Sequence, residues 1–185
     1  EDPINYILSK ALYENPDTNF NYNSGVSHLL SVIIESNTGL TTYDFANKYL
    51  FEPLAIKKSD IKWQVDKKNR VYGGHGLSMK IDDLEKIGVM YLNGGLYHGE
   101  RIVSKSWTYE STLSHSKKTR GYAGYGYQFW IGHIKNEEFY GAFGHAGQRI
   151  YVFKDLDMVV TFLGNVKPEF GIQEKLIRNF IFDKQ

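Results

Sequence analysis

The chain has 185 residues, 42% hydrophobic and 15% aromatic, which suffices for one hydrophobic core or two closely packed lobes. Its 22 basic and 21 acidic residues give a net charge of +1, so no overall field draws nucleic acid or an anionic membrane to it, and neither is expected as a partner. The absence of cysteine excludes disulfides, thiolate metal sites and a cysteine nucleophile, and no apolar run approaches the ~20 residues of a membrane span.

Two helices are predicted in the first forty residues. Asp2-Pro3 is typical of a helix start, and apolar residues continue on one face of that helix as far as Leu12, before residues 15–17 end it. The second helix follows Tyr22 and ends at Gly39, a typical C-terminal cap. Its predicted buried stripe consists of Val26, Leu29, Leu30, Ile33 and Ile34.

Three shorter helical segments come next. One begins at Thr41 or Thr42 and ends at Pro53-Leu54, a second runs from Asp82 or Asp83 to Asn93, and Ser104 caps a third. Between the first two, residues 55–72 are polar and irregular, and residues 73–76 (Gly-Gly-His-Gly) predict a flexible turn. Residues 117–121 are expected to form a solvated loop.

The periodicity then changes to that of strands, predicted at residues 125–131, 139–143, 148–153 and 158–163, with a turn at 154–157. A final helix is expected to open at Pro168. This order predicts an α+β domain with a helical lobe at residues 1–120, followed at 121–185 by an antiparallel sheet and a C-terminal helix.

Several stretches together resemble the serine β-lactamase and penicillin-binding-protein superfamily, in particular its class C-like branch of esterases, D-amino-acid peptidases and amide hydrolases. Tyr22-Asn23-Ser24 resembles the family's Tyr-x-Asn element, and His145-Ala146-Gly147 resembles its Lys-Thr-Gly strand. The other similar stretches are residues 50–54 (Leu-Phe-Glu-Pro-Leu), 74–79 (Gly-His-Gly-Leu-Ser-Met), 125–130 (Tyr-Gly-Tyr-Gln-Phe-Trp) and Gly94-Gly95. The likeness runs from about residue 15 to 166 and implies a β-lactamase-like fold.

The family's Ser-x-x-Lys nucleophile motif belongs upstream of the tyrosine motif. Ser59-x-x-Lys62 and Ser114-x-x-Lys117 both follow Tyr22 and sit in polar loops, so we interpret them as chance matches. The resemblance therefore predicts a C-terminal fragment that lacks its nucleophile and is inactive alone. The first residue is Glu1 and not Met, so the chain is expected to be processed or cut.

The resemblance assigns catalytic roles to two residues. Tyr22 would be the general acid/base, activated by the lysine of the absent motif, because a free phenol titrates near pH ~10. Its alternative role is an aromatic residue that closes a helix start. Gln148 would offer its backbone N–H to the oxyanion, beside the N–H of the nucleophile.

Four further residues would bind substrate. Ser24 would bond a substrate amide or the catalytic lysine, although serine at this place is also a good helix cap. His145 would occupy the position of a carboxylate-binding cation; since a histidine carries only a partial positive charge near neutrality, a peptidase, amidase or esterase is favoured over a potent β-lactamase. Ala146 and Gly147 would let the chain approach the substrate, or would simply form a strand edge.

No cofactor is expected, and the spacing of the six histidines predicts no metal site; His75 is interpreted as a turn residue rather than a cleft residue. Expected partners are a small-molecule or peptide substrate, and either the missing N-terminal segment or a second copy, which would cover an unpaired sheet edge. The compartment is unknown, with a secreted or cell-envelope bacterial protein suggested by the resemblance alone. The alternatives are an inactive relative that binds peptide or cell-wall fragments, and a purely structural interaction domain.

Overall fold

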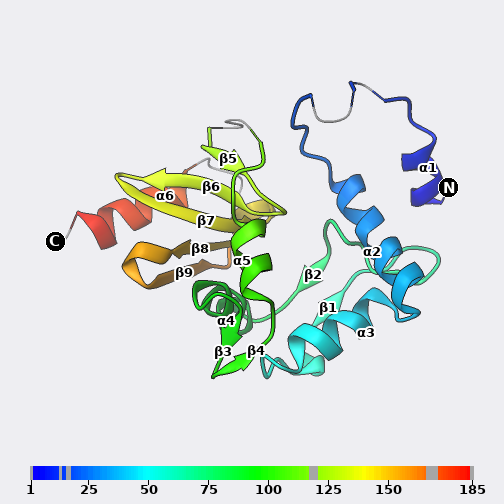
Figure 1. Cartoon of the computed structure of the whole chain (residues 1–185), viewed down its shortest axis with the longest axis horizontal. Helices are drawn as coiled ribbons and strands as arrows, with labels where there is room; N and C mark the ends of the chain where they lie inside the picture. Colours follow the sequence, from blue (N-terminus) through cyan, green and yellow to red (C-terminus); the bar gives the residue numbers. More distant parts are fainter. Residues whose placement is uncertain (1, 13, 16–17, 117–120, 166–170, 184–185) are drawn as a thin grey trace. The chain divides into compact units, whose positions relative to one another are not determined.

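The protein is described by a computed structural model that covers residues 2–12, 14–15, 18–116, 121–165 and 171–183 (Figure 1). The chain forms two compact units, Glu1–Lys80 and Ile81–Gln185. The boundary predicted after residue 120 adjoins residues 117–120, which lie outside the described residues together with the loop predicted there. The division into lobes 1–120 and 121–185 therefore stays a prediction.

The first unit is mainly helical, with one small antiparallel strand pair. Its elements are α1 (Pro3–Leu8), α2 (Ser24–Thr38), α3 (Thr42–Ala46), a π-helical turn (Asn47–Phe51), a 3₁₀ turn (Lys58–Asp60), β1 (Lys62–Trp63) and β2 (Leu77–Ser78). Of the two threonines predicted to start α3, Thr41 is its cap, and its Oγ1 accepts the Asp44 N–H at 3.0 Å. Gly39 ends α2 in the left-handed conformation, with φ of 69°. Threonine and glycine thus set these two helix ends as their capping chemistry requires.

Helix α1 starts as predicted but is shorter. Asp2 accepts the Ile4 N–H at 3.0 Å, and only Ile4 of the helix is buried. Ser9 then closes the last turn, donating its hydroxyl to the Tyr6 carbonyl at 2.8 Å. Leu8 and Leu12 are 68% and 80% exposed, so the predicted apolar face reaching Leu12 is wrong. A serine that bonds back to the helix end competes with further helix growth.

The buried face of α2 also differs from the prediction. Val26, Leu30 and Ile33 are 55%, 45% and 54% exposed, whereas His28 and Ser31 are buried. The polar side of the helix therefore faces the rest of the unit, and an apolar ridge faces outward. Residues 66–74 pack on this face and give its polar groups partners, because the Gly73 N–H donates to His28 and Arg70 pairs with Glu35.

The second unit is built around a five-stranded antiparallel sheet of order β5-β6-β7-β8-β9 (Figure 1). Its strands are β5 (Gly124–Tyr125), β6 (Trp130–Ile134), β7 (Glu137–Phe143), β8 (Arg149–Phe153) and β9 (Met158–Phe162). The remaining elements are α4 (Ile81–Leu92), the hairpin β3 (Leu96–Tyr97) and β4 (Glu100–Arg101), α5 (Lys105–Ser111), 3₁₀ turns (His145–Gly147 and Lys154–Leu156), α6 (Ile172–Ile177) and a π-helical turn (Arg178–Phe182). This confirms the α+β order and the turn at residues 154–157.

The single strand predicted at 125–131 is wrong, because the segment folds into β5, a tight turn and β6. The Gly126 N–H donates to the Phe129 carbonyl at 2.8 Å, and Gln128 has φ of 69°. The start of the last helix expected at Pro168 lies outside the described residues; the described helix begins at Ile172, after Gly171.

Alternation along β8 divides its side chains between two layers. Ile150 faces α4, where an added Cβ on Gly88 would come within 2.9 Å of Ile150 and 2.7 Å of Val159 on β9. The opposite face carries the core formed by Ile134, Phe139, Tyr151, Phe153 and Ile177, which joins the sheet to α6. Gly88 therefore allows α4 to approach the sheet closely.

A carboxylate from α6 anchors two phenols of the sheet unit. Glu174 Oε1 accepts the hydroxyls of Tyr151 at 2.7 Å and of Tyr122 at 3.1 Å. Burial, and then the charge of Glu174, raises the pKa of both tyrosines well above the usual range. Burial likewise raises the pKa of Tyr140, whose hydroxyl donates to the Tyr91 carbonyl.

None of the described helices is both long and apolar enough to cross a membrane. Across the same described residues, no group of three or more His, Cys, Asp or Glu side chains could hold a metal ion.

We expect the second unit to lose stability at alkaline pH. The folded state favours the neutral phenols. Their contribution to the free energy of unfolding is therefore complete below the pKa of ~10 that tyrosine has in the unfolded chain, and above that pH it falls by about 1.4 kcal/mol per pH unit for each tyrosine. Tyrosinate absorbance should then rise together with loss of secondary structure by circular dichroism. Tyr151→Phe should reduce this pH slope and Tyr109→Phe, at a 61% exposed position, should not; equal slopes would contradict the expectation.

Candidate active site

The residues predicted to carry chemistry lie in both units: Tyr22 and Ser24 in the first, and His145, Ala146, Gly147 and Gln148 in the second.

Asn23 caps α2, and this corrects the interpretation of Ser24 as the cap. The Asn23 side chain accepts the N–H groups of Gly25 at 2.8 Å and Val26 at 3.4 Å. Ser24 is the first helical residue and is exposed. The half-buried Tyr22 immediately precedes the cap. The cap is therefore residue 23 and not residue 24, and Ser24 Oγ takes no part in capping.

The segment Gly73-Gly74 packs directly on the backbone of α2. An added Cβ on Gly74 would lie 2.4 Å from the Ser24 carbonyl oxygen, and one on Gly73 would lie 2.6 Å from the Ser27 carbonyl oxygen and 2.5 Å from Ser31 Oγ. Only glycine permits so close an approach. The turn that the sequence predicts at residues 73–76 is thus a close neighbour of the helix start that follows Tyr22. We call Gly73-Gly74 the glycine clamp.

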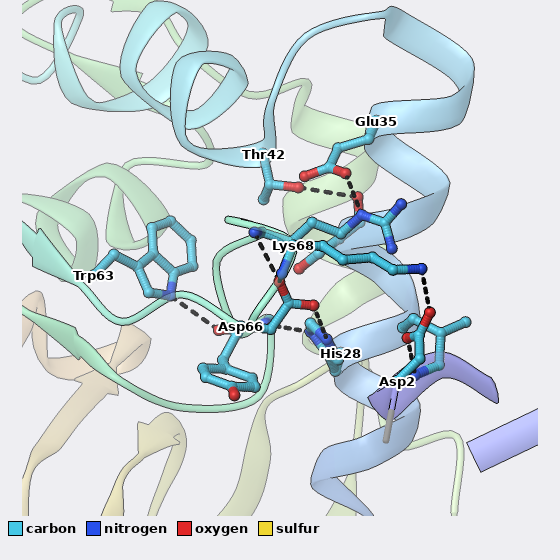
Figure 2. A network of polar contacts seen from close by, with 12 residues as sticks. Asp2, His28, Glu35, Thr42, Trp63, Asp66 and Lys68 are labelled. Atoms are coloured by element: carbon cyan, nitrogen blue, oxygen red, sulfur yellow. Dashed lines mark hydrogen bonds and ion pairs between the residues drawn. The ribbon is translucent and has the colours of Figure 1, made fainter. Parts of the chain in front are cut away.

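A buried histidine of α2 holds the glycine clamp. The Gly73 N–H donates to His28 Nδ1 at 3.2 Å, and His28 Nε2 lies 4.0 Å from Asp66 Oδ2 (Figure 2). The His28 and Asp66 side chains are 4% and 1% exposed. His75, by contrast, is exposed and stacks on Tyr72 with centroids 4.4 Å apart, in agreement with its interpretation as a turn residue.

Asp66 also shapes the connection between β1 and β2. Its Oδ1 accepts the N–H groups of Lys68 at 2.8 Å and Arg70 at 3.0 Å. Arg70 Nε donates to Glu35 of α2 at 3.0 Å, and the Lys68 ammonium pairs with Asp2 at the start of α1 (Figure 2). The segment predicted to be irregular is therefore organised around one buried carboxylate.

His28 and Asp66 are not among the functional residues predicted from the sequence. A usable signal was present, because Ser24, His28, Ser31 and Glu35 recur at helical spacing and mark a polar stripe on α2. The stronger apolar pattern on the other side of the helix outweighed it. Only the partners that the polar stripe meets distinguish a buried polar face from a solvated one.

In the second unit, His145-Ala146-Gly147 forms a 3₁₀ turn between β7 and β8, directly before the strand predicted at residues 148–153. Ala146 has φ of 57° and Gly147 has φ of 97°, both in the left-handed region, and β8 begins at Arg149. The reversal between antiparallel neighbours requires these positive φ values. His145 is exposed, whereas Gly147 is buried.

Gln148 leaves this turn with its side chain fixed. Its Nε2 donates to the Gly164 carbonyl at 2.8 Å, and its own carbonyl accepts the Gly144 N–H at 2.9 Å. Arg149 Nη1 donates to the carbonyls of Gly144 and, at 2.8 Å, of Gln148. Among the residues that the structure describes, none accepts the Gln148 N–H in a hydrogen bond.

A family model described as Beta-lactamase matches residues 1–179. The chain belongs to the Beta-lactamase family. The 6-aminohexanoate-dimer hydrolase of Paenarthrobacter ureafaciens is 34% identical over 95 residues, which are 51% of this chain and 24% of that protein.

Two solved structures show that the fold is β-lactamase-like. A provisionally assigned 6-aminohexanoate-dimer hydrolase from Bacillus anthracis superposes with a TM-score of 0.73 and 23% identity, covering 92% of this chain and 45% of that protein. An octameric penicillin-binding protein homologue from Pyrococcus abyssi gives a TM-score of 0.72 at 23% identity, covering 91% and 44%. This Beta-lactamase family chain thus spans less than half the length of these relatives.

The Ser-x-x-Lys string at residues 59–62 does not lie on an α-helix, as a nucleophile motif of this family would. Ser59 lies in a 3₁₀ turn and Lys62 in β1. In the other string, Ser114 donates its hydroxyl to the Ser116 carbonyl at 2.8 Å, and Lys117 lies outside the described residues.

The capping assignment predicts different stability effects for two adjacent residues. Asn23→Ala should destabilise the first unit by about 1 kcal/mol because two helix N–H groups lose their acceptor, whereas Ser24→Ala should change stability by less than about 0.5 kcal/mol. Urea unfolding followed by circular dichroism measures both. A larger cost for Ser24→Ala would restore serine as the cap.

Proposed function

We propose that this chain is the C-terminal part of a serine hydrolase of the Beta-lactamase family, which hydrolyses an amide, peptide or ester through an acyl-serine intermediate. Tyr22 acts as general acid/base, and Gln148 donates its N–H to the oxyanion. The serine nucleophile comes from another part of the intact protein, so the 185-residue chain alone is inactive.

The capping of α2 by Asn23, between Tyr22 and Ser24, is the observation that carries this proposal. Asn23 alone caps the helix, so the neighbouring Tyr22 and Ser24 side chains are not needed for the cap. In the proposed reaction Tyr22 takes the proton of the serine and later returns it to the leaving group. This requires a cation beside the phenol to stabilise its ionised form, a role that a lysine of the nucleophile motif would fill.

The turn before β8 supports the second half of the proposal. Gly147 has no Cβ, its φ is 97°, and the N–H of the following Gln148 has no acceptor among the described residues. Such an N–H, fixed by a hydrogen-bonded backbone, is the type of donor that stabilises a tetrahedral oxyanion. A second donor would come from the nucleophile itself.

Ser24 and His145 are proposed to bind substrate, with Ala146 and Gly147 forming the wall beside it. Ser24 and His145 are both exposed and differ from the commoner asparagine and lysine of the family motifs. A hydrogen-bonding side chain at 145, in place of the family's lysine, suits an amide better than a strongly anionic substrate. Because two relatives carry the name 6-aminohexanoate-dimer hydrolase, this dimer is the first amide to test.

A second candidate is an inactive family member that binds a peptide or a cell-wall fragment. The same two departures from the motifs, at Ser24 and His145, favour it. The two candidates differ in one property: the enzyme has a Ser-x-x-Lys motif on a helix upstream of Tyr22, and the binding module does not.

The catalytic proposal predicts the behaviour of two preparations. The 185-residue chain alone should not turn over nitrocefin, a p-nitrophenyl ester or the 6-aminohexanoate dimer. In the longer protein that carries the upstream serine motif, Tyr22→Phe should lower kcat by about 10²–10⁴-fold, because general acid/base catalysis is lost. Tyr49→Phe, at an exposed position, is the control. Tyr22-dependent hydrolysis by the pure chain would refute the fragment hypothesis.

We further propose that another segment of the longer protein, or a second copy of the chain, covers α2. Val26, Leu30 and Ile33 form a continuous exposed apolar ridge at helical spacing. The sheet edge at β9 is a second candidate surface, since this strand pairs only with β8 within the described sheet.

Without its cover the ridge should cause self-association of the isolated chain. Leu30→Lys should therefore shift the chain toward monomer in light scattering, whereas Ser36→Lys, an equal charge at an exposed site of the same helix, should have little effect. A wild-type chain that is already a stable monomer would count against the covering segment.

A further inference from the structure

We infer that His28 is a positioning residue whose neutral imidazole, oriented by Asp66, holds the glycine clamp on α2 and so sets the position of Tyr22 and Ser24. The functional importance of these two residues rests on the proposed function. The positioning itself is a property of the chain and can be measured without catalysis.

The hydrogen bond to Gly73 determines the protonation state of the ring. Because the Gly73 N–H donates to His28 Nδ1, this nitrogen carries a lone pair and no proton. The proton of the neutral ring is therefore on Nε2, which points toward Asp66 Oδ2 across 4.0 Å. A second proton on the ring would occupy Nδ1 and remove the acceptor of the Gly73 N–H.

Asp66 is held in place independently of His28. Its Oδ1 is engaged by the backbone N–H groups of Lys68 and Arg70, and Oδ2 remains without a hydrogen-bond partner among the described residues, as does His28 Nε2. The carboxylate thus presents one fixed oxygen to the Nε2 side of the ring (Figure 2). This arrangement favours the tautomer that leaves Nδ1 free to accept from the clamp.

The clamp transmits the state of the ring to the helix start. Gly73 touches the backbone of Ser27, and Gly74 touches that of Ser24 so closely that neither has room for a Cβ. Loss of the Gly73 hydrogen bond allows this segment to lift from α2. The first turn, with Ser24 in it and Tyr22 directly before its cap, then loses its closest neighbour.

The other charged side chains around His28 are paired with opposite charges. From the β1–β2 connection these are Lys68, paired with Asp2 of α1, and Arg70, paired with Glu35 of α2. The Tyr72 ring lies 5.3 Å from the His28 ring, centroid to centroid, and also stacks with His75. Helix α3 contributes the uncharged Thr42, whose hydroxyl donates to the Ser31 carbonyl. Asp66 is the charged group that the structure places against the ring, with its Oδ2 4.0 Å from Nε2.

The experiment is an NMR study of the full chain at about pH 8 and about pH 5, the two sides of the histidine titration range. Long-range proton–nitrogen spectra identify the His28 tautomer, and hydrogen exchange measures the protection of the Gly73 amide, corrected for intrinsic rates. His28→Asn places an amide oxygen at the position of Nδ1 but cannot titrate. His28→Leu removes the acceptor.

We expect the Nε2-protonated tautomer at about pH 8, and Gly73 protection that falls by about three- to tenfold at about pH 5, the value of one hydrogen bond. The Tyr22 and Ser24 resonances should shift in parallel. His28→Asn should keep protection at both pH values, and His28→Leu should lose it at both.

Three results would overturn the inference: an Nδ1-protonated tautomer, an equal acid-induced loss of protection in His28→Asn, or a Gly73 signal that changes without Tyr22 and Ser24. Should His28→Leu fail to fold, the wild type and His28→Asn still decide the question. Absence of hydrolytic activity in the longer protein would refute the proposed function and leave this result unchanged.

Discussion

The contact of two glycines with the backbone of α2 is the constraint on which the first unit depends. At Gly73 and Gly74 the chain approaches carbonyl oxygens more closely than any side chain would allow, and the approach brings the Gly73 amide to His28. That hydrogen bond requires an acceptor on a buried helix face, and the acceptor in turn requires Asp66 beside it. The polar character of this interior follows from the close approach, because buried polar groups need partners.

The second unit is organised by apolar packing instead. Alternation along β8 and β9 sends one set of side chains to α4 and the other to α6, and the glycine at position 88 allows α4 to lie close to the sheet. The turn that contains His145 and Gly147 is placed by two adjacent strands of this rigid sheet. In the proposed reaction, the Gln148 N–H benefits from that rigidity, since a preorganised dipole needs no rearrangement.

Much of the fold could be predicted from the sequence because the signals are local. Thr41 and Ser104 cap helices, Gly39 ends one, and the alternation from residue 139 to 162 marks three strands. The errors have equally specific causes. Asn23 and Ser24 are both residue types that cap helices well, so the sequence does not decide which of them caps α2. The strand predicted at 125–131 contains a turn, and the positive φ of this turn falls on Gln128 instead of a glycine.

The sequence by itself determined the α+β order, the family resemblance and the identity of Tyr22, Ser24 and His145–Gln148 as candidate residues, because helix caps, periodicity and short motifs act over a few neighbouring positions. Only the tertiary structure decided that α2 buries its polar side, that His28 faces Asp66, and that Gly73 bonds to that histidine. These contacts join residues about forty positions apart. Which face of a helix is buried depends on the partners that pack against it, and that information is not local.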